Sequence, residues 1–403
     1  MDDLLFLAHR IPYPPRKGDK IRSYHLLRAL AARYRVHLGA FVDDAADAAH
    51  AATVAGMCRG ETRLVRLNPW RAKLRALRGF ATGEALTLPY YDHPDMRGWV
   101  AEMLHRHPIR RVVVYSAAPA QFVMELDPTI RRVMDFVDVD SAKWAQYAER
   151  RSGLARWLYR REARTLLAAE QAITTRFDQV LFVSEPEAGL FREQSPEHAA
   201  KIGYWENGVD LDYFSPERSY PNPYQPGDLP LVFTGAMDYW PNVDAVVWFA
   251  REVFAPLTHA LPRARFVIVG GRPTPEVVQL QSIPGITVTG NVPDVRPWIC
   301  GAKAAVAPLR IAQGIQNKVL EAMALGKPVL ATSKAMEGIR YTPPLDRWVA
   351  DTPETLRTKA AALLSGADED GTLPPCGPLG RELMRRNCHW ETNLARALAA
   401  VEG

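Results

Sequence analysis

Cysteine, net charge and long apolar runs are all scarce in this chain of 403 residues. The four cysteines, at positions 58, 300, 376 and 388, have neither metal-type nor redox-type spacing, which argues against zinc and predicts free thiols in a reducing compartment. The formal net charge is only +5. A balance this mild gives no support to a nucleic-acid partner, although it suits phosphate-bearing small molecules or an anionic membrane surface.

Segments that would carry the chain into or across a membrane are also missing from the sequence. No stretch approaches the roughly 18 consecutive apolar residues that a spanning helix needs. The start of the chain, MDDLLFLA, is acidic, and its apolar run is too short for a signal peptide. We therefore expect a cytoplasmic protein, with peripheral contact at the inner face of the plasma membrane left open.

Short apolar runs alternate with amphipathic segments of helical length along the whole chain, which is the rhythm of βα units that build a parallel sheet. Strands are predicted at residues 4–8, 36–42, 62–67, 111–115, 132–136 and 179–183, and again at 231–234, 265–269, 286–289, 304–307, 328–331 and 348–350. The fold class is therefore α/β, with two doubly wound, Rossmann-like domains in series. Ligands of such sheets sit at the carboxyl ends of the strands, so we expect substrate in a cleft between two facing domains.

A domain boundary is indicated by the segment SPERSYPNPYQPGDLP at residues 215–230, where proline, glycine and polar residues gather without periodicity. We place a linker at 213–230. The N-terminal domain, 1–212, is expected to bind the acceptor, and the C-terminal domain, 231–380, the donor.

The most informative stretch is AAVAPLRIAQGIQNKVLEAMALGKPVLA, residues 304–331, which reads as one βαβ unit. Gly314 permits a tight turn, and the helix that begins near Gln316 or Asn317 presents free N–H groups and a positive dipole end to an anion such as a diphosphate. Lys318 in the first turn opposes that dipole, which favours an anionic ligand nearby. Glu321, about one turn further on, can accept hydrogen bonds from both hydroxyls of a ribose. An ordinary buried βαβ unit with a solvated Lys and Glu is the alternative.

The string KVLEAMALGKPV, with the glycine turn and the strand before it, resembles the donor-site signature of the retaining glycosyltransferases of family four, which have the GT-B architecture. Three further blocks, RIPYPPRKGDKIRSYHLLRALA, MDFVDVDSAKWAQYA and FTGAMDYWPNVDAVVWF, resemble the sugar transferases of exosortase and PEP-CTERM exopolysaccharide systems. The blocks are spread over nearly the whole chain. The resemblance also implies that a terminal helix, 381–403, returns to pack on the first domain.

The family motif has two glutamates separated by seven residues, of which Glu321 matches the second and Gln313 occupies the place of the first. The resemblance implies that Glu321 binds the ribose, whereas an amide at Gln313 changes the hydrogen bonds offered to the transferred sugar. The backbone N–H groups of Gly314, Ile315 and Gln316 suit sugar hydroxyls or phosphate oxygens.

Family members often carry an arginine and a lysine after the first strand of the donor domain, where this chain has TGAMDYW and no cation. Lys318 and Arg310 are the candidate substitutes that would stabilise the charge on the departing diphosphate. Gly235, directly after its strand, would let the backbone approach the ligand; a plain tight turn is the alternative.

Two N-terminal segments also follow predicted strands. Gly18 begins the approach to a helix and could contact a phosphate or the donor sugar, while Lys20 and Arg22 beside it also fit simple solvated charges. Asp138 is the candidate for orienting the acceptor hydroxyl or the donor sugar, in a family position where Val137 replaces a common histidine. The alternative is a helix N-cap, for which Asp140 or Ser141 is better placed.

Two basic segments carry aromatic and aliphatic residues among their arginines: residues 70–80 and 150–166. They could contact anionic lipid headgroups, which would suit a lipid-linked acceptor; helices that bury their apolar stripe and solvate their arginines are the alternative.

We expect a glycosyltransferase of the hexosyltransferase type, EC 2.4, that moves a sugar from a nucleotide diphosphate sugar to a polysaccharide or lipid-linked acceptor, in exopolysaccharide or cell-surface glycan synthesis. The resemblance alone implies retention of configuration. Lys318 and Asp138 are the candidate catalytic residues. No cofactor or metal is expected, because cations and the helix dipole supply the positive charge. A nucleotide-sugar epimerase or hydrolase, or an inactive glycan- or nucleotide-binding scaffold, are the alternatives.

Overall fold

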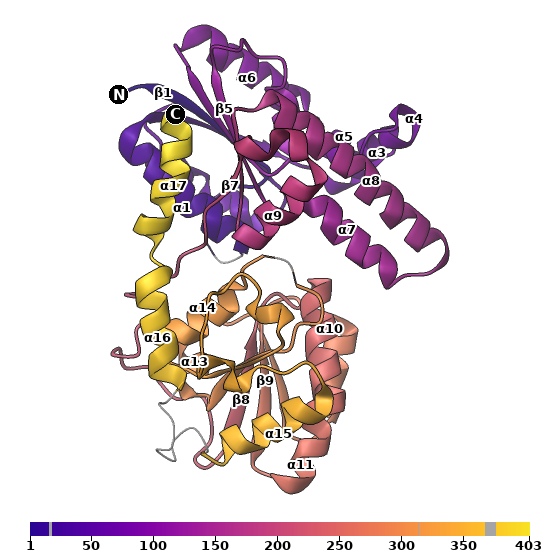
Figure 1. Cartoon of the computed structure of the whole chain (residues 1–403), viewed down its shortest axis with the longest axis vertical. Helices are drawn as coiled ribbons and strands as arrows, with labels where there is room; N and C mark the ends of the chain where they lie inside the picture. Colours follow the sequence, from indigo (N-terminus) through magenta and orange to yellow (C-terminus); the bar gives the residue numbers. More distant parts are fainter. Residues whose placement is uncertain (16–17, 313, 367–375) are drawn as a thin grey trace. The chain divides into compact units, whose positions relative to one another are not determined.

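The computed structural model describes residues 1–15, 18–312, 314–366 and 376–403. The chain forms two compact units: unit 1 comprises Met1–Glu206 and Glu391–Gly403, and unit 2 comprises Asn207–Trp390 (Figure 1). Our sequence prediction put the start of the linker at 213 and the start of the returning segment at 381.

Unit 1 is built on a seven-stranded sheet in which every pairing is parallel, with the strand order β3-β2-β1-β4-β5-β6-β7. Helices cover both faces, and all six residues of β1 are buried, which is why the strand reads as a continuous apolar run. The strands are β1 (Asp3–Ala8), β2 (Arg35–Val42), β3 (Thr62–Arg66), β4 (Arg111–Tyr115), β5 (Arg131–Val137), β6 (Gln179–Phe182) and β7 (Ile202–Tyr204).

The helices of unit 1 are α1 (Gly18–Arg33), α2 (Ala51–Met57), α3 (Pro69–Ala76), α4 (Arg78–Thr82), α5 (Thr87–Tyr91), α6 (Pro94–Arg106), α7 (Asp140–Glu149), α8 (Gly153–Arg176), α9 (Glu185–Gln194) and, apart from its first residue, α17 (Trp390–Glu402). Several begin with a side-chain cap and a proline in the first turn, as α3, α6 and α9 do. Short 3₁₀ turns occupy Ala45–His50, Ala118–Phe122 and Pro196–Lys201.

Unit 2 has a five-stranded parallel sheet in the order β10-β9-β8-β11-β12. Its strands are β8 (Leu229–Thr234), β9 (Ala264–Val269), β10 (Ile286–Gly290), β11 (Ala304–Ala307) and β12 (Val329–Ala331). Its helices are α10 (Trp240–Trp248), α11 (Ala255–Ala260), α12 (Pro275–Gln279), α13 (Arg296–Gly301), α14 (Asn317–Ala324), α15 (Pro353–Leu364) and α16 (Cys376–Asn387). Phe249–Phe254 forms a π-helical segment between α10 and α11, and 3₁₀ turns lie at Leu280–Ser282, Lys334–Met336 and Leu345–Trp348.

The predicted α/β class with two doubly wound parallel sheets is confirmed. Two details of the strand prediction were wrong. Residues 348–350 supply only a bridge between Val349 and Ala331, beside a helical turn, and β7 was missed because three residues are too few to show a period of two.

Strand order places the ligand-binding edge of each unit. The order reverses between β1 and β4 in unit 1 and between β8 and β11 in unit 2, and ligands of doubly wound sheets bind outside the carboxyl ends of the strands at such points. Within the described parts of the chain, no helix combines the length and hydropathy needed to cross a bilayer.

Candidate functional site

Three segments of unit 2 meet at the carboxyl end of β8. They are the turn at Gly235, the first turn of α10 and the first turn of α14. The Nζ atom of Lys318 donates a hydrogen bond to Oδ1 of Asn242 at 2.6 Å and lies 4.3 Å from the centre of the Phe233 ring. The amide nitrogen of Asn242 in turn donates to the carbonyl oxygen of Ala236 at 2.9 Å. Neither Asn242 nor Phe233 was predicted from the sequence, because cations were the expected diphosphate ligands of this loop and it contains none.

The charge of Lys318 is poorly stabilised where it stands. Burial lowers the pKa of its ammonium group to about 7, and the opposite charge of Glu321 counteracts only part of that shift. The positive end of α14 also disfavours a cation in the first turn. Burial likewise raises the pKa of Glu321 to about 7, against the attraction of Lys318. An anion bound at this helix end would therefore stabilise the charged form of Lys318.

Two glycines bring backbone close to Lys318. A Cβ atom on Gly235 would lie 2.8 Å from Nδ2 of Asn242 and 3.3 Å from Nζ of Lys318, and one on Gly270 would lie 1.7 Å from the carbonyl oxygen of Gly235. The N–H of Gly235 donates to the carbonyl oxygen of Val269 at 3.0 Å, which ties the loop after β8 to the end of β9. A side chain at either glycine would therefore force this loop to move. Gly270 was likewise not predicted from the sequence.

The predicted anion-binding turn before α14 has the backbone that the sequence indicated. Gly314 adopts a positive φ of 65°, and Gln316, the residue before the helix, donates its side-chain amide to the carbonyl oxygen of Gly314 at 3.2 Å. Ile315 packs against the apolar core of unit 2. Asn317 accepts a hydrogen bond from Asn207 at 3.1 Å. Gln313 lies outside the described residues.

Arg310 is engaged elsewhere, which argues against its predicted role at the diphosphate. Its guanidinium group donates to both carboxylate oxygens of Asp244, at 2.5 and 3.1 Å, and lies 5.1 Å from the ring centre of Trp248. Asp244 is on α10, two residues after Asn242. Lys318 is therefore the better placed of the two predicted cations.

An aromatic group also stands near Glu321. Burial raises the pKa of the Tyr213 hydroxyl, and the charges of Asp294 and Glu321 add to that shift, whereas Arg296 opposes it. The guanidinium of Arg296 stacks 3.6 Å from the centre of the Tyr213 ring and donates to the Tyr213 carbonyl oxygen at 3.0 Å. Tyr213 remains exposed. A planar ligand group bound beside Glu321 would therefore lie near the exposed ring of Tyr213, in the same unit.

In unit 1, Asp138 follows β5 directly after a strained residue. Val137 has a φ of 76°, which β-branched residues adopt only under constraint, and a register shift accompanies it in the pairing of β5 with β6. Burial raises the pKa of Asp138 to about 7, with Glu187 and Asp140 adding to the shift. The N-cap position of α7 is Val139, with no side-chain cap, so the predicted N-cap alternative is wrong. Asp138 is thus a half-buried carboxyl group with a shifted pKa at the carboxyl edge of the sheet.

The interpretation of Lys20 and Arg22 as solvated charges is wrong. Arg22 is fully buried and binds Asp135, with nitrogen to oxygen distances of 3.0–3.3 Å, while its guanidinium lies 3.5 Å from the ring centre of Trp205. Trp205 also donates to Asp135, at 2.9 Å. Lys20 is buried against Asp47. These two cations therefore hold α1 in place, and Gly18 begins that helix as an exposed residue.

One group of metal-type ligands occurs in the described residues: Asp3, His37 and His107, whose ligand atoms lie within 4.8 Å of one another. Both ring nitrogens of His37 are already used, because Nε2 lies 2.9 Å from Asp3 and Nδ1 accepts the N–H of Glu61 at 3.1 Å. A metal would have to displace one of these bonds. The group also lies near the amino ends of β1 and β2, far along the strands from the edge where ligands bind.

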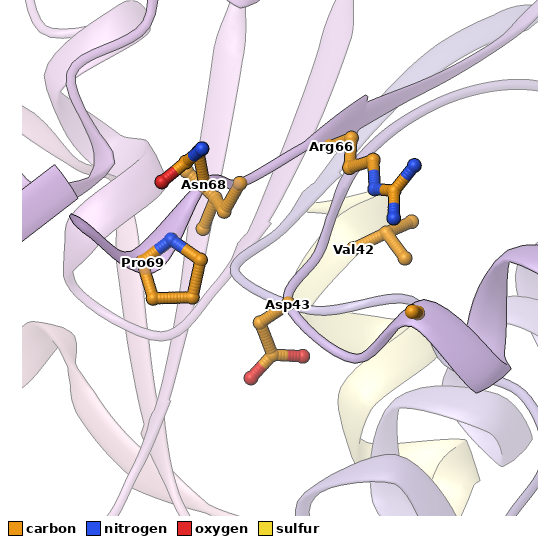
Figure 2. A pocket seen from close by; sticks show the side chains of 7 residues that line it. Val42, Asp43, Arg66, Asn68 and Pro69 are labelled. Atoms are coloured by element: carbon orange, nitrogen blue, oxygen red, sulfur yellow. The ribbon is translucent and has the colours of Figure 1, made fainter. Parts of the chain in front are cut away.

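A hollow of about 510 Å³ lies at the carboxyl ends of β2 and β3 in unit 1 (Figure 2). Its polar lining includes Asp43, which pairs with Arg10 at 2.8 Å, and the exposed Arg66. The side chain of Asn68 caps α3 by accepting from the N–H groups of Trp70 and Arg71. No motif in the sequence pointed to this hollow.

Solved structures of the same architecture define the class of fold. The chain has the GT-B fold of glycosyltransferases, as comparison with three of them shows. An Anabaena protein, HepE, in complex with UDP and glucose, matches with a TM-score of 0.67 and 11% identity over 100% of both chains. Sucrose-phosphate synthase of Thermosynechococcus elongatus matches with a TM-score of 0.66 and 17% identity, over 99% of this chain and 100% of that one. WaaG, a glycosyltransferase of lipopolysaccharide biosynthesis, matches with a TM-score of 0.66 and 17% identity over the same shares.

Similarity to a protein family in sequence is confined to a smaller part of the chain than the structural similarity. Residues 229–365 match the family described as Glycosyl transferases group 1. The matched segment runs from β8 to just beyond α15 and so contains Gly235, Asn242, Lys318 and Glu321. The likeness in sequence to this family thus lies within unit 2. Among curated protein sequences, none matches the chain.

Proposed function

We propose that this protein is a glycosyltransferase of the hexosyltransferase type that transfers a sugar from a nucleotide diphosphate sugar to a polysaccharide or lipid-linked acceptor, in the synthesis of exopolysaccharide or another cell-surface glycan. One observation carries the proposal. Lys318 stands at the start of α14, beside the glycine turn after β8, with a pKa lowered to about 7 and no hydrogen-bonding anion among the described residues. A diphosphate is the group that this arrangement suits best.

The proposed reaction follows from the charge that develops on the donor. The bond from the anomeric carbon to the diphosphate oxygen breaks, and the electron pair leaves with the diphosphate. Lys318 and the N–H groups at the start of α14 would stabilise that negative charge more in the transition state than in the ground state. The acceptor hydroxyl oxygen forms the new bond to the anomeric carbon, and its proton passes to the departing diphosphate. Glu321 would accept the ribose hydroxyls.

Three further assignments belong to the proposal. Asp138 would orient the acceptor hydroxyl or the transferred sugar, which its shifted pKa and position at the carboxyl edge of unit 1 support. The configuration at the anomeric carbon would be retained, as the resemblance to family four implies. No metal would be needed, because a lysine and a helix end provide the positive charge, so a chelator should leave turnover unchanged.

Isothermal calorimetry with UDP-glucose tests the donor site, because the Anabaena protein of the same fold was solved with UDP and glucose. Other nucleotide diphosphate sugars follow as a panel. For the donor that binds, Glu321→Ala should weaken the affinity at least about tenfold, since each charge-assisted hydrogen bond contributes about 1.5–3 kcal/mol. Glu354→Ala, an exposed glutamate on α15, is the matched control and should bind like the parent protein.

Product analysis by NMR then separates transfer from its competitors. Transfer predicts nucleoside diphosphate together with a glycosylated acceptor of the same anomeric configuration as the donor. Free sugar in place of a glycoside would indicate a hydrolase, an isomerised nucleotide sugar an epimerase, and binding without turnover a scaffold. Unchanged donor affinity in Glu321→Ala would contradict the assigned site itself.

A further inference from the structure

Six large apolar side chains are exposed on the α3, α4 and α8 side of unit 1. They are at least 44% exposed, and Leu154 reaches 79%. Trp70 and Leu74 belong to α3, Leu77 follows it, Phe80 is in α4, and Leu154 and Trp157 are at the start of α8. These six residues are called the Trp70 surface below. No other part of the described chain exposes so many large apolar side chains within two neighbouring segments.

The members of the Trp70 surface form one patch. Residues 70, 74 and 77 recur at helical spacing, so they share a face. The rings of Phe80 and Trp157 lie parallel, with an interplanar angle of 5° and centres 6.4 Å apart. Arg161 of α8 places its guanidinium 4.8 Å from the Phe80 ring centre and also donates to the carbonyl oxygen of Gly79. These contacts join α4 to α8.

Basic residues outnumber acidic ones around the Trp70 surface, and the exposed Glu84 and Glu149 stand at the ends of its two segments. Residues 63–83 contain six Arg or Lys and no Asp or Glu, and residues 150–161 contain five Arg and again no acidic residue. Most members of this set are exposed: Arg63, Arg66, Arg71, Lys73, Arg78, Arg150, Arg151, Arg156 and Arg160. Arg78 pairs with Asp92 at 3.7 Å, and Glu162 is buried against the N–H groups of Leu86 and Thr87.

We propose that the Trp70 surface is a docking site for an anionic lipid bilayer, with its tryptophan, phenylalanine and leucine side chains in the headgroup region and its cations at lipid phosphates. This combination of apolar anchors and cations is what interfacial binding to anionic lipid requires. A second copy of the chain is a poorer occupant, because two such surfaces would bring like charges together. Nucleic acid is poorer as well, because bases stack on aromatic rings but gain nothing from three exposed leucines.

The proposal is tested by co-sedimentation of the full chain with phosphatidylcholine vesicles that contain about one third phosphatidylglycerol, or none. Binding should be at least about tenfold stronger to the anionic vesicles and should weaken as salt is added. The double variant Trp70→Ser and Trp157→Ser, and separately Arg71→Glu with Lys73→Glu, should each weaken it about tenfold or more. All four positions are exposed, so thermal unfolding should remain close to that of the parent chain.

Val278→Ser and Arg251→Glu are matched controls, because both residues are exposed on unit 2 and neither belongs to the Trp70 surface. They should bind vesicles like the parent chain. Equal binding by the parent and the charge variant would overturn the proposal, as would binding of single-stranded RNA without binding of vesicles, or a dimer that the same variants abolish. No nucleotide sugar is present in the assay, so its result is independent of the proposed transfer reaction.

Discussion

Lys318 and Glu321 lie about one helical turn apart with opposite charges, and burial brings the pKa of both side chains to about 7. The protonation of each group therefore depends on what binds beside it. A diphosphate favours the charged lysine and raises its pKa, while ribose hydroxyls that donate to the carboxylate lower the pKa of the glutamate. A single ligand thus acts on the two groups in opposite directions.

Proton linkage should consequently change sign with pH when UDP-glucose, or the donor found in its place, binds. At about pH 8 the free lysine is largely neutral, so binding should take up a proton. At about pH 6 the free glutamate is largely protonated, so binding should release one. Calorimetry in buffers of different ionisation enthalpy measures both.

Single variants separate the two halves of that linkage. Lys318→Met should abolish the uptake and Glu321→Gln the release, and persistence of both effects in either variant would contradict the assignment.

Lys318→Met should also keep or raise the free energy of unfolding at pH 7 and below. Its folded pKa is lowered from 10.5, so the lysine destabilises the fold fully below pH 7 and progressively less between pH 7 and 10.5. Urea unfolding provides that measurement.

Among the elements, the loops after β8 and β9 depend on each other. The space between them is so small that a methyl group on Gly270 would meet the carbonyl oxygen of Gly235 at 1.7 Å, and that oxygen is backbone, which cannot rotate away. The loop after β8 in turn contacts Asn242 and Lys318. A change at Gly270, directly after β9, therefore reaches the candidate donor site without contacting the ligand.

Gly270→Ala should weaken donor binding about tenfold or more, because a displacement of about 1 Å at a binding site has effects of this order. Gly271→Ala is the natural control: its added Cβ would find its nearest atom, Oδ1 of Asn291, at an ordinary 3.4 Å. Calorimetry measures the donor affinity of both variants. Equal affinities would show that the loop after β8 does not shape the site.

At the scale of the whole molecule, the last helix is what returns the chain to unit 1. Arg131 of β5 donates to the carbonyl oxygen of Ala400 at 2.8 and 3.0 Å, and Arg33 of α1 forms an ion pair with Glu402. The guanidinium of Arg396 lies 5.0 Å from the ring centre of Tyr204 in β7. Residues from both ends of the chain are thus needed to complete unit 1.

Leu398→Ala should lower the stability of unit 1 by about 2–4 kcal/mol, since Leu398 is a buried residue of α17. Hydrogen exchange should show the loss in β7 and α1. Thr392→Ala, an exposed position on the same helix, should leave exchange unchanged. Loss of protection confined to α17 itself would mean that unit 1 holds without it.

Local pattern was enough to predict much of this protein. Apolar runs of strand length predicted nearly all the strands, and the residues from Gly314 to Glu321 predicted a glycine turn followed by a helix with an anion-binding start. The strand missed at Ile202–Tyr204 was too short for its pattern to be read. The sequence left open whether Arg22 is a solvated charge. In the structure it is buried against Asp135, and because that partner is 113 residues away, no local pattern could predict the pairing.

What the sequence by itself determined is the succession of strands and helices and the chemistry of α14, because both depend on neighbours a few residues apart. Only the tertiary structure decided which groups surround Lys318. Asn242 is 76 residues from it, and the order β9-β8-β11 is what brings their helices to one edge of the sheet. Periodicity carries no information on strand order, so neither Asn242, nor Gly270, nor the pairing of Arg310 with Asp244 could be predicted from it.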